Sequence, residues 1–269
     1  MSQDLTIFSV FHKEYMVPQC DFIKPIQVGR KSSSVDLGFI SDDVGKNIAD
    51  KNGTYSELTA LYWIWKNLDK IDSNWIGLCH YRRYFILPET FLKKRLLQTK
   101  TIVDSRDVYL KELSNENLLQ VASDKLKSNL IEALKTGYII VPVASATSIE
   151  LLYDASIKNH YIYYHIKEDW YLMRDVVIKL YPELKDIFDT FFDSETTMYN
   201  YNMFISDKKT FQAYCEWLFP IVFELEKVVK ISEYPYQKRV FGFLSERLIN
   251  FYINYNNLKT KEFPVVFFN

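Results

Sequence analysis

The stretch NWIGLCH, residues 74–80, decides the fold, because it has the pattern of a buried strand and is followed at once by YRRYF. Working outward from it, LTIFSVF (5–11) and KPIQVG (24–29) also have the β-branched and apolar pattern of strands. Between these strands Thr54 and Glu57 form a T-x-x-E capping box, followed by apolar residues at helical spacing. Strand, loop, helix and strand therefore alternate, which predicts an α/β nucleotide-binding fold.

The remainder of the chain continues this mixed pattern. TGYIIVPVA (136–144) and MYNYNMFIS (198–206) are predicted strands. Predicted helices cover residues 165–181, 207–230 with an interruption at Pro220, and 236–255. We expect a Rossmann-like mixed sheet flanked by helices, with a helical C-terminal portion. The expected organisation is one domain, 1–269, with a nucleotide-binding half (1–88), a helical insertion (89–135) and an acceptor and catalytic half (136–269).

Composition excludes several classes of protein. A net charge of −1 disfavours general nucleic-acid binding. Three widely spaced cysteines form neither a disulfide framework nor a zinc cluster, and they fit a reducing cytoplasm. No apolar run approaches the roughly 20 residues that span a bilayer, and the N-terminal residues lack a secretory signal pattern. We expect a cytoplasmic protein, with any membrane contact peripheral through FLKKRLLQTK (91–100), although a solvated helix face also explains that stretch.

Polar side chains gather at the ends of the predicted strands. His12 and Lys13 follow the first, Gln27 and Gly29 close the second, and HYRR (80–83) closes the third. Ligands of open α/β sheets bind beyond the carboxyl ends of the strands. Two adjacent guanidinium groups there could hold a diphosphate through bidentate hydrogen bonds. The alternative is that the arginines are surface residues paired with acids of the 42–57 loop.

Candidates for metal binding and for a catalytic base are less definite. The chain has no D-x-D, H-x-x-x-H or C-x-x-C motif, so histidines such as His80 either assist a cation or hydrogen-bond within the fold. Glu168 and Asp169 begin a predicted helix, where an acid is either a general base or a partner of the helix dipole. Trp170 either stacks on a sugar or belongs to the core. The absence of G-x-S-x-G, P-loop and G-x-G-x-x-G motifs removes the common hydrolase, NTPase and dinucleotide interpretations.

The chain resembles a bacterial family of capsular and exopolysaccharide glycosyltransferases, catalogued as domain of unknown function 4422. HYRRYF, YNMFI and EWLFPIVFELE carry the resemblance most specifically. Further matching stretches are FHKEY (11–15), PIQVG (25–29), DDVGKNIADKNGTYSELTALYWIWKN (42–67), IIVP (139–142), HIKEDWYLMRDVV (165–177) and RVFGFLSERL (239–248). They extend over nearly the whole chain.

The resemblance implies a GT-A-like fold and transfer of a hexose, with galactose or galactofuranose favoured, from a UDP-sugar to a saccharide, lipid-linked or glycoprotein acceptor. Many GT-A enzymes hold the diphosphate through a D-x-D motif and Mn²⁺ or Mg²⁺, and HYRR stands in that place here. By this analogy Arg82 and Arg83 stabilise the leaving diphosphate. His80 is a further donor or a metal ligand, and the missing D-x-D motif leaves the divalent metal undecided.

The resemblance also implies roles for other residues. HIKEDW is similar to the element that supplies the base of inverting GT-A enzymes, so Asp169 is the expected base, with Glu168 as the alternative. The expected donor-binding residues are His12, Lys13, Gln27, Gly29, Asn47, Asn52, Tyr55, Glu57, His80, Arg82 and Arg83. The expected acceptor-binding residues are Asn202, His165 and Trp170.

Two other functions remain open at this stage. A glycosidase would use two converging carboxylates and no diphosphate clamp. A non-catalytic carbohydrate-binding or assembly protein would not need an acid at position 169.

Overall fold

One mixed β-sheet organises the molecule. The computed structural model describes residues 3–88, 108–149 and 155–269. Seven strands of the sheet lie in the order β11-β7-β10-β4-β1-β2-β3, with β5, β12 and β6 continuing from β4. Their bounds are β1 Gln3–Phe11, β2 Ile23–Gln27, β3 Ile40–Ser41, β4 Ser73–His80, β5 Arg83–Phe85, β6 Val108–Lys111, β7 Ile139–Pro142, β10 Phe204–Asp207, β11 Thr260–Phe263 and β12 Val265–Phe268. A separate pair joins β8 Ser145–Ala146 and β9 Thr197–Met198.

The centre of the sheet is parallel and buried on both faces. β1 pairs in parallel with both β2 and β4, so the carboxyl ends of these strands meet at one edge. Along β1, Ile7 packs into one core cluster and Phe8 into the other. Such continuous apolar strands are typical of sheets covered on both faces. The expected mixed sheet flanked by helices is confirmed.

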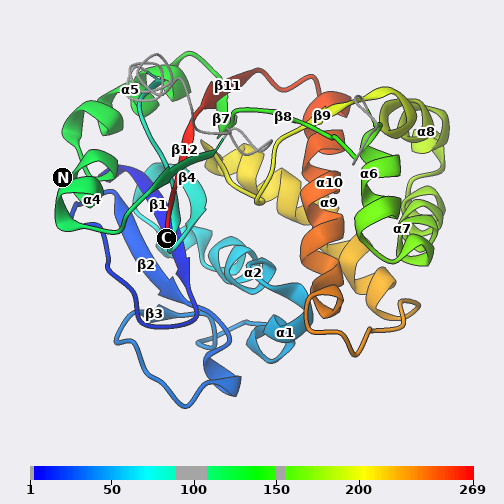
Figure 1. Cartoon of the computed structure of the whole chain (residues 1–269), viewed down its shortest axis with the longest axis horizontal. Coiled ribbons are helices and arrows are strands. Elements are labelled where there is room, and N and C mark those ends of the chain that lie inside the picture. Colours follow the sequence, from blue (N-terminus) through cyan, green and yellow to red (C-terminus); the bar gives the residue numbers. More distant parts are fainter. Residues whose placement is uncertain (1–2, 89–107, 150–154) are drawn as a thin grey trace.

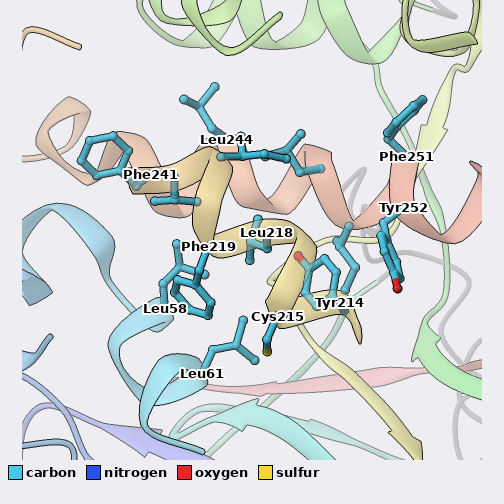
Figure 2. Packing of buried hydrophobic residues seen from close by; sticks show 14 of the residues in the cluster. Leu58, Leu61, Tyr214, Cys215, Leu218, Phe219, Phe241, Leu244, Phe251 and Tyr252 are labelled. Atoms are coloured by element: carbon cyan, nitrogen blue, oxygen red, sulfur yellow. The ribbon is translucent and has the colours of Figure 1, made fainter. Parts of the chain in front are cut away.

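Helices cover the two faces in separate groups (Figure 1). The short helices α4 Asn115–Val121 and α5 Asp124–Lys135 bury leucines against one face. The opposite face carries α2 Leu58–Lys66, α9 Lys208–Glu226 and α10 Val240–Tyr255, whose leucines and aromatic rings interlock in Figure 2. The remaining helices are α1 Asn52–Tyr55, α6 Ile157–Tyr164, α7 Lys167–Leu180 and α8 Lys185–Ser194, with short 3-10 turns at Arg30–Ser32, Ala49–Lys51, Leu68–Lys70, Pro182–Leu184 and Gln237–Arg239.

Gly77 lets β4 and β10 approach closely. A Cβ atom at this position would lie 2.6 Å from the Ile205 side chain and 2.8 Å from the Phe204 carbonyl oxygen. These separations are far below van der Waals contact, so the position accepts only glycine without a shift of β10. This contact joins the strands of the two halves of the chain.

The predicted capping box at Thr54 and Glu57 is wrong. The helix is broken at Ser56, whose φ is 53°, and Thr54 Oγ1 donates to the Lys51 carbonyl instead. Glu57 accepts a hydrogen bond from Asn202, 145 residues away. A tertiary contact therefore takes the carboxylate that a local cap would have used.

Other differences concern the second half. The helix expected over 207–230 is not interrupted at Pro220, which lies inside the continuous α9. The strand expected at 198–206 is divided into β9 and β10 by a turn. The stretch FLKKRLLQTK (91–100) lies outside the described residues, and the division of the chain into two halves and an insertion stays a prediction. Within the described ranges no helix is long and apolar enough to cross a membrane.

Candidate functional site

A cleft of about 900 Å³ opens where the sheet edge meets the C-terminal helices. Its walls are the ends of β1 and β4, the turn into β5, α1, the first half of α10, the end of α6 and the segment 145–148. Seven of the predicted site residues line it: His12, Asn52, Glu57, His80, Arg82, Arg83 and His165. The structure thus brings together both arginines and part of the expected donor side.

Arg82 and Arg83 are held in place by aromatic rings. The Arg82 guanidinium lies over the rings of Tyr81 and Phe267, at 5.0 and 4.8 Å, and the Arg83 guanidinium lies over Tyr201 and Phe267, at 4.8 and 4.9 Å. Both Nε atoms are buried and lack a hydrogen-bond partner. Within the described part of the chain neither arginine has a carboxylate partner, so pairing with acids of the 42–57 loop is not observed. Guanidiniums that are held by aromatic rings and have no carboxylate partner are prepared to bind an anion.

A third arginine, Arg239, also lines the cleft. Arg239 precedes α10, and its Nε donates to Ser56 Oγ at 3.0 Å. Desolvation lowers the pKa of His12, and repulsion from Lys13, Arg239 and Arg82 lowers it further. Arg239 and Arg82 therefore lie close enough to the same imidazole to act on its charge. The cleft gathers positive charge from β1, the β4–β5 turn and α10.

His80 has a structural partner. Its Nε2 lies 2.6 Å from the carbonyl oxygen of Tyr201 and donates to it. Burial lowers the pKa of His80 to about 4, with repulsion from Arg83 next in importance, so the ring is neutral at pH 7. The described residues contain no group of three or more His, Cys, Asp or Glu side chains that could hold a metal ion.

The turn at Tyr201 and Asn202 is strained and tightly held. These two consecutive residues have φ of 75° and 51°, which side-chain-bearing residues rarely adopt. Besides the bond from His80, the Tyr201 N–H donates to Glu246, and the Asn202 amide donates to Glu57 at 2.5 Å and to the Gly242 carbonyl at 3.0 Å. This turn places the Tyr201 ring on Arg83, and Asn202 itself is buried outside the cleft.

Among the described residues two carboxylates line the cleft, Glu57 and Glu246. Glu246 forms an ion pair with Arg247 at 2.6 Å, and the Arg247 side chain is nearly inaccessible. Glu57 forms no ion pair within the described ranges, and its hydrogen bond from Asn202 occupies Oε1. Glu57 is therefore the one of these two carboxylates without a paired cation in the described structure.

The residues expected to supply the base do not line the cleft. Asp169 is only 4% exposed in the first turn of α7, and burial raises its pKa to about 6, with repulsion from Glu168 second. Glu168 is exposed, and Trp170 packs in the core against Tyr161 and Phe192. Asp169 is absent from the cleft because its side chain is buried beside the aromatic core, which its position in a motif did not indicate.

Five further predicted donor residues lie outside the cleft. Both ends of the Gln27 amide are bonded to the backbone of Val35 and Leu37. The Gly29 N–H donates to Asp42, and the Asn47 amide donates to the carbonyls of Asp43 and Gly45. Tyr55 is fully buried. The Lys13 ammonium lies over the Tyr81 ring.

The sequence analysis missed Arg239, Phe243, Glu246, Arg247 and Phe267. A signal was present in part, because Arg239, Phe243 and Glu246 recur at i, i+4 and i+7 on a helix whose other positions are mostly apolar. Phe267 had no comparable signal. Only the pairing of β12 with β5 places its ring against the arginines.

Comparisons with known proteins agree with this description. The apo structure of the bifunctional glycosyltransferase WbbM has the same fold, with a TM-score of 0.84 and 30% identity over 99% of this chain. The chain spans 46% of that protein's length. No curated protein sequence matches significantly. The family described as domain of unknown function (DUF4422) matches residues 6–257, and the chain belongs to this family.

Proposed function

We propose that this chain is a glycosyltransferase that moves a hexose, galactose or galactofuranose, from a UDP-sugar to a saccharide acceptor in surface polysaccharide synthesis. The observation that carries the proposal is the convergence of Arg82, Arg83 and Arg239 in one cleft, without carboxylate partners in the described ranges. The similarity to a glycosyltransferase structure supports the same reaction class. A glycosidase has no use for such a concentration of anion-binding groups.

In the proposed mechanism the arginines hold the diphosphate of the donor. Departure of UDP places negative charge on the β-phosphate, and guanidinium donors already fixed by aromatic rings stabilise that charge without rearrangement. The proposal assigns the nucleoside to the side of the cleft lined by His12, which follows β1, and by Asn52, which begins α1. The donor therefore lies across the carboxyl ends of the parallel strands.

A divalent metal does not fit the groups that line this cleft well. Glu246 is neutralised by Arg247, and His80 uses its Nε2 on the Tyr201 carbonyl. Glu57 has no ion-pair partner in the described structure, but Asn202 already bonds its Oε1, and a single carboxylate is a poor ligand set for Mn²⁺ or Mg²⁺. The proposed mechanism assigns neutralisation of the diphosphate to arginine alone.

Glu57 is the proposed general base. It lines the cleft, carries no ion pair in the described structure, and is oriented by the buried amide of Asn202. It would take the proton of the acceptor hydroxyl as that oxygen attacks the anomeric carbon from the side opposite UDP, which inverts the configuration. Asp169 remains a prediction from sequence, but this assignment does not use it.

A donor panel tests the proposal. UDP-galactose, UDP-galactofuranose and other UDP-hexoses are incubated with the protein with and without EDTA, and release of UDP is measured. We expect release from one donor, unchanged by EDTA, and a sharp loss in Glu57→Gln with UDP binding retained. Failure to bind UDP or to release it from any donor would contradict the proposed function. A requirement for Mn²⁺ would contradict the arginine-only mechanism.

A further inference from the structure

An aromatic shelf forms the wall of the cleft at the end of α6. It consists of Tyr164, His165, Tyr236 and Phe243, all of which line the cleft. The His165 and Tyr236 rings are stacked with 11° between their planes, and Phe243 contacts both, with centroids 4.2 Å from His165 and 5.0 Å from Tyr236. Tyr236 is 59% exposed and Tyr164 is 42% exposed, so large ring faces remain open.

Gln237 fixes the two elements of the shelf to each other. Its Nε2 donates to the Tyr164 carbonyl at 2.9 Å, and its Oε1 accepts from His165 Nδ1 at 3.2 Å. Burial lowers the pKa of His165 to about 3, followed by repulsion from Arg247, so the ring is neutral. Because Nδ1 carries the proton, Nε2 is an unprotonated acceptor. The shelf is therefore rigid before any ligand binds, and it presents one hydrogen-bond acceptor beside its apolar faces.

The shelf lies apart from the groups suited to the nucleotide. Nucleosides in open α/β sheets bind beyond the carboxyl ends of the strands, here the side of Val10, His12 and Val28. Arg239 marks the boundary, because its guanidinium lies 5.6 Å from the Phe243 ring and its charge acts on His12. The lining of the cleft also includes the polar side chains of Ser148 and Asn200.

Two charges near the shelf, those of Arg247 and Glu246, are paired with each other, while the charge of Arg239 lies at the boundary with the donor side. Arg247 forms the ion pair with Glu246 and bonds His160 Nδ1 at 3.3 Å. A neutral ligand fits such a wall better than an anion does. The apolar C–H face of a sugar ring matches an exposed aromatic face, while its hydroxyls match the surrounding acceptors and donors.

We propose that Tyr164, His165 and Tyr236 bind the acceptor, a neutral saccharide whose terminal sugar ring lies on the Tyr236 ring. This inference rests on the proposed function, because it places the acceptor in the half of the cleft that the donor leaves free. Tyr236 is then a residue that determines acceptor affinity and has no part in holding UDP.

Saturation-transfer NMR with methyl β-D-galactopyranoside, methyl β-D-glucopyranoside and methyl α-D-mannopyranoside tests the inference, with the protein saturated by UDP. We expect transfer to the hydrogens of one ring face of at least one glycoside. Tyr236→Ala should raise its Kd about tenfold or more, and Tyr236→Phe should retain binding. Tyr171→Ala is the matched control, because Tyr171 is 41% exposed on α7 and does not line the cleft.

The affinity for UDP, measured by calorimetry on the same variants, separates the outcomes. Unchanged UDP affinity in Tyr236→Ala supports the inference. Loss of UDP affinity with unchanged glycoside binding would overturn it and place the nucleobase on the shelf. Wild-type protein that binds UDP but shows no transfer to any glycoside would also overturn it. Wild-type protein that does not bind UDP would contradict the proposed function, whereas glycoside binding lost in Tyr236→Ala would still establish the saccharide shelf.

Discussion

At the scale of single residues, the neighbours of each arginine decide whether its guanidinium can bind a ligand or is held within the fold. Arg82 and Arg83 lie over the Phe267 ring, so their hydrocarbon and π surfaces are satisfied while their hydrogen-bond donors are not. Arg247 also has a buried Nε without a partner, but its other nitrogens donate to Glu246, to the Phe243 carbonyl and to His160. Of the four arginines that line the cleft in the described structure, Arg82, Arg83 and Arg239 have no carboxylate partner, whereas Arg247 is paired with Glu246.

Arg82→Ala should lower kcat/KM for UDP-sugar hydrolysis by roughly 10²–10³-fold, the usual loss when one group that stabilises developing charge is removed. Steady-state kinetics and thermal unfolding of the variant check this expectation, and Tm should change little. Arg174→Ala is the control, since it removes an arginine that pairs with Asp189 on the helical side. Equal activity of Arg82→Ala and wild type would remove Arg82 from the mechanism.

Asp169→Asn should leave transfer intact and stabilise the protein at neutral pH. Burial raises the pKa of Asp169 in the folded state to about 6, above the value of about 4 for an unfolded chain, so the folded state binds more protons in that range. The protonated Asp169 carboxyl therefore stabilises the wild-type protein below pH 4. This stabilisation is lost as the pH rises from 4 through 6. In thermal unfolding measured from pH 4 to 7, the Tm of the variant should rise relative to the Tm of the wild type. An inactive Asp169→Asn would return the role of base to Asp169.

At the scale of elements, strands were easier to predict than the turns that join them. β1, β4 and α7 follow directly from apolar periodicity, because each buries the side chains that the pattern predicts. The turn at Tyr201 and Asn202 had no local signal, since its left-handed backbone depends on bonds to His80, Glu57 and Glu246 from three distant segments. The same contacts broke the predicted capping box. Local patterns predict elements well, but they do not reveal where tertiary hydrogen bonds override them.

Gly77→Ala should destabilise the fold by about 1–3 kcal/mol, the usual cost of overpacking. The added methyl group would meet Ile205 and the Phe204 carbonyl, which belong to β10. Denaturant unfolding measures the change. Gly53→Ala is the matched control, because nothing lies closer than 4.0 Å to a Cβ at that helical position. A neutral effect of Gly77→Ala would mean that β10 moves away at little cost.

At the scale of the whole molecule, the site lies where the sheet edge and the C-terminal helices meet. The sequence placed the arginines at a strand end correctly, but it could not reveal that α10 lines the same cleft or that β12 packs Phe267 against the arginines. Arg239 and Phe267 are 157 and 185 residues beyond Arg82 in the numbering, and only sheet topology and helix packing bring them together. The position of Asp169 in a motif gave no information on whether its side chain is buried, and the structure shows that it is.

Acid should destabilise the protein well before its carboxylates are fully protonated. Burial lowers the pKa of His80 and His160 to about 4 and of His165 to about 3, below the unfolded value near 6.5. The unfolded chain then binds more protons as pH falls, so stability is lost from pH 6.5 downward, by about 1.4 kcal/mol per pH unit for each histidine.

Calorimetric unfolding at several pH values checks this slope. The double variant His80→Asn, His160→Asn should show a shallower decline than wild type between pH 6.5 and 5. An identical decline would show that these two rings are protonated in the folded protein.

The most direct measurement of the central claim is the affinity for UDP relative to uridine in the presence of EDTA, by titration calorimetry. If arginines alone hold the pyrophosphate, wild-type protein should bind UDP about 100-fold or more tightly than uridine, since charge-assisted hydrogen bonds contribute about 1.5–3 kcal/mol each. Arg82→Ala and Arg239→Ala should each reduce this ratio about tenfold while leaving uridine affinity unchanged. Equal affinities for UDP and uridine, or a preference for UDP that appears only with added Mn²⁺, would contradict the account.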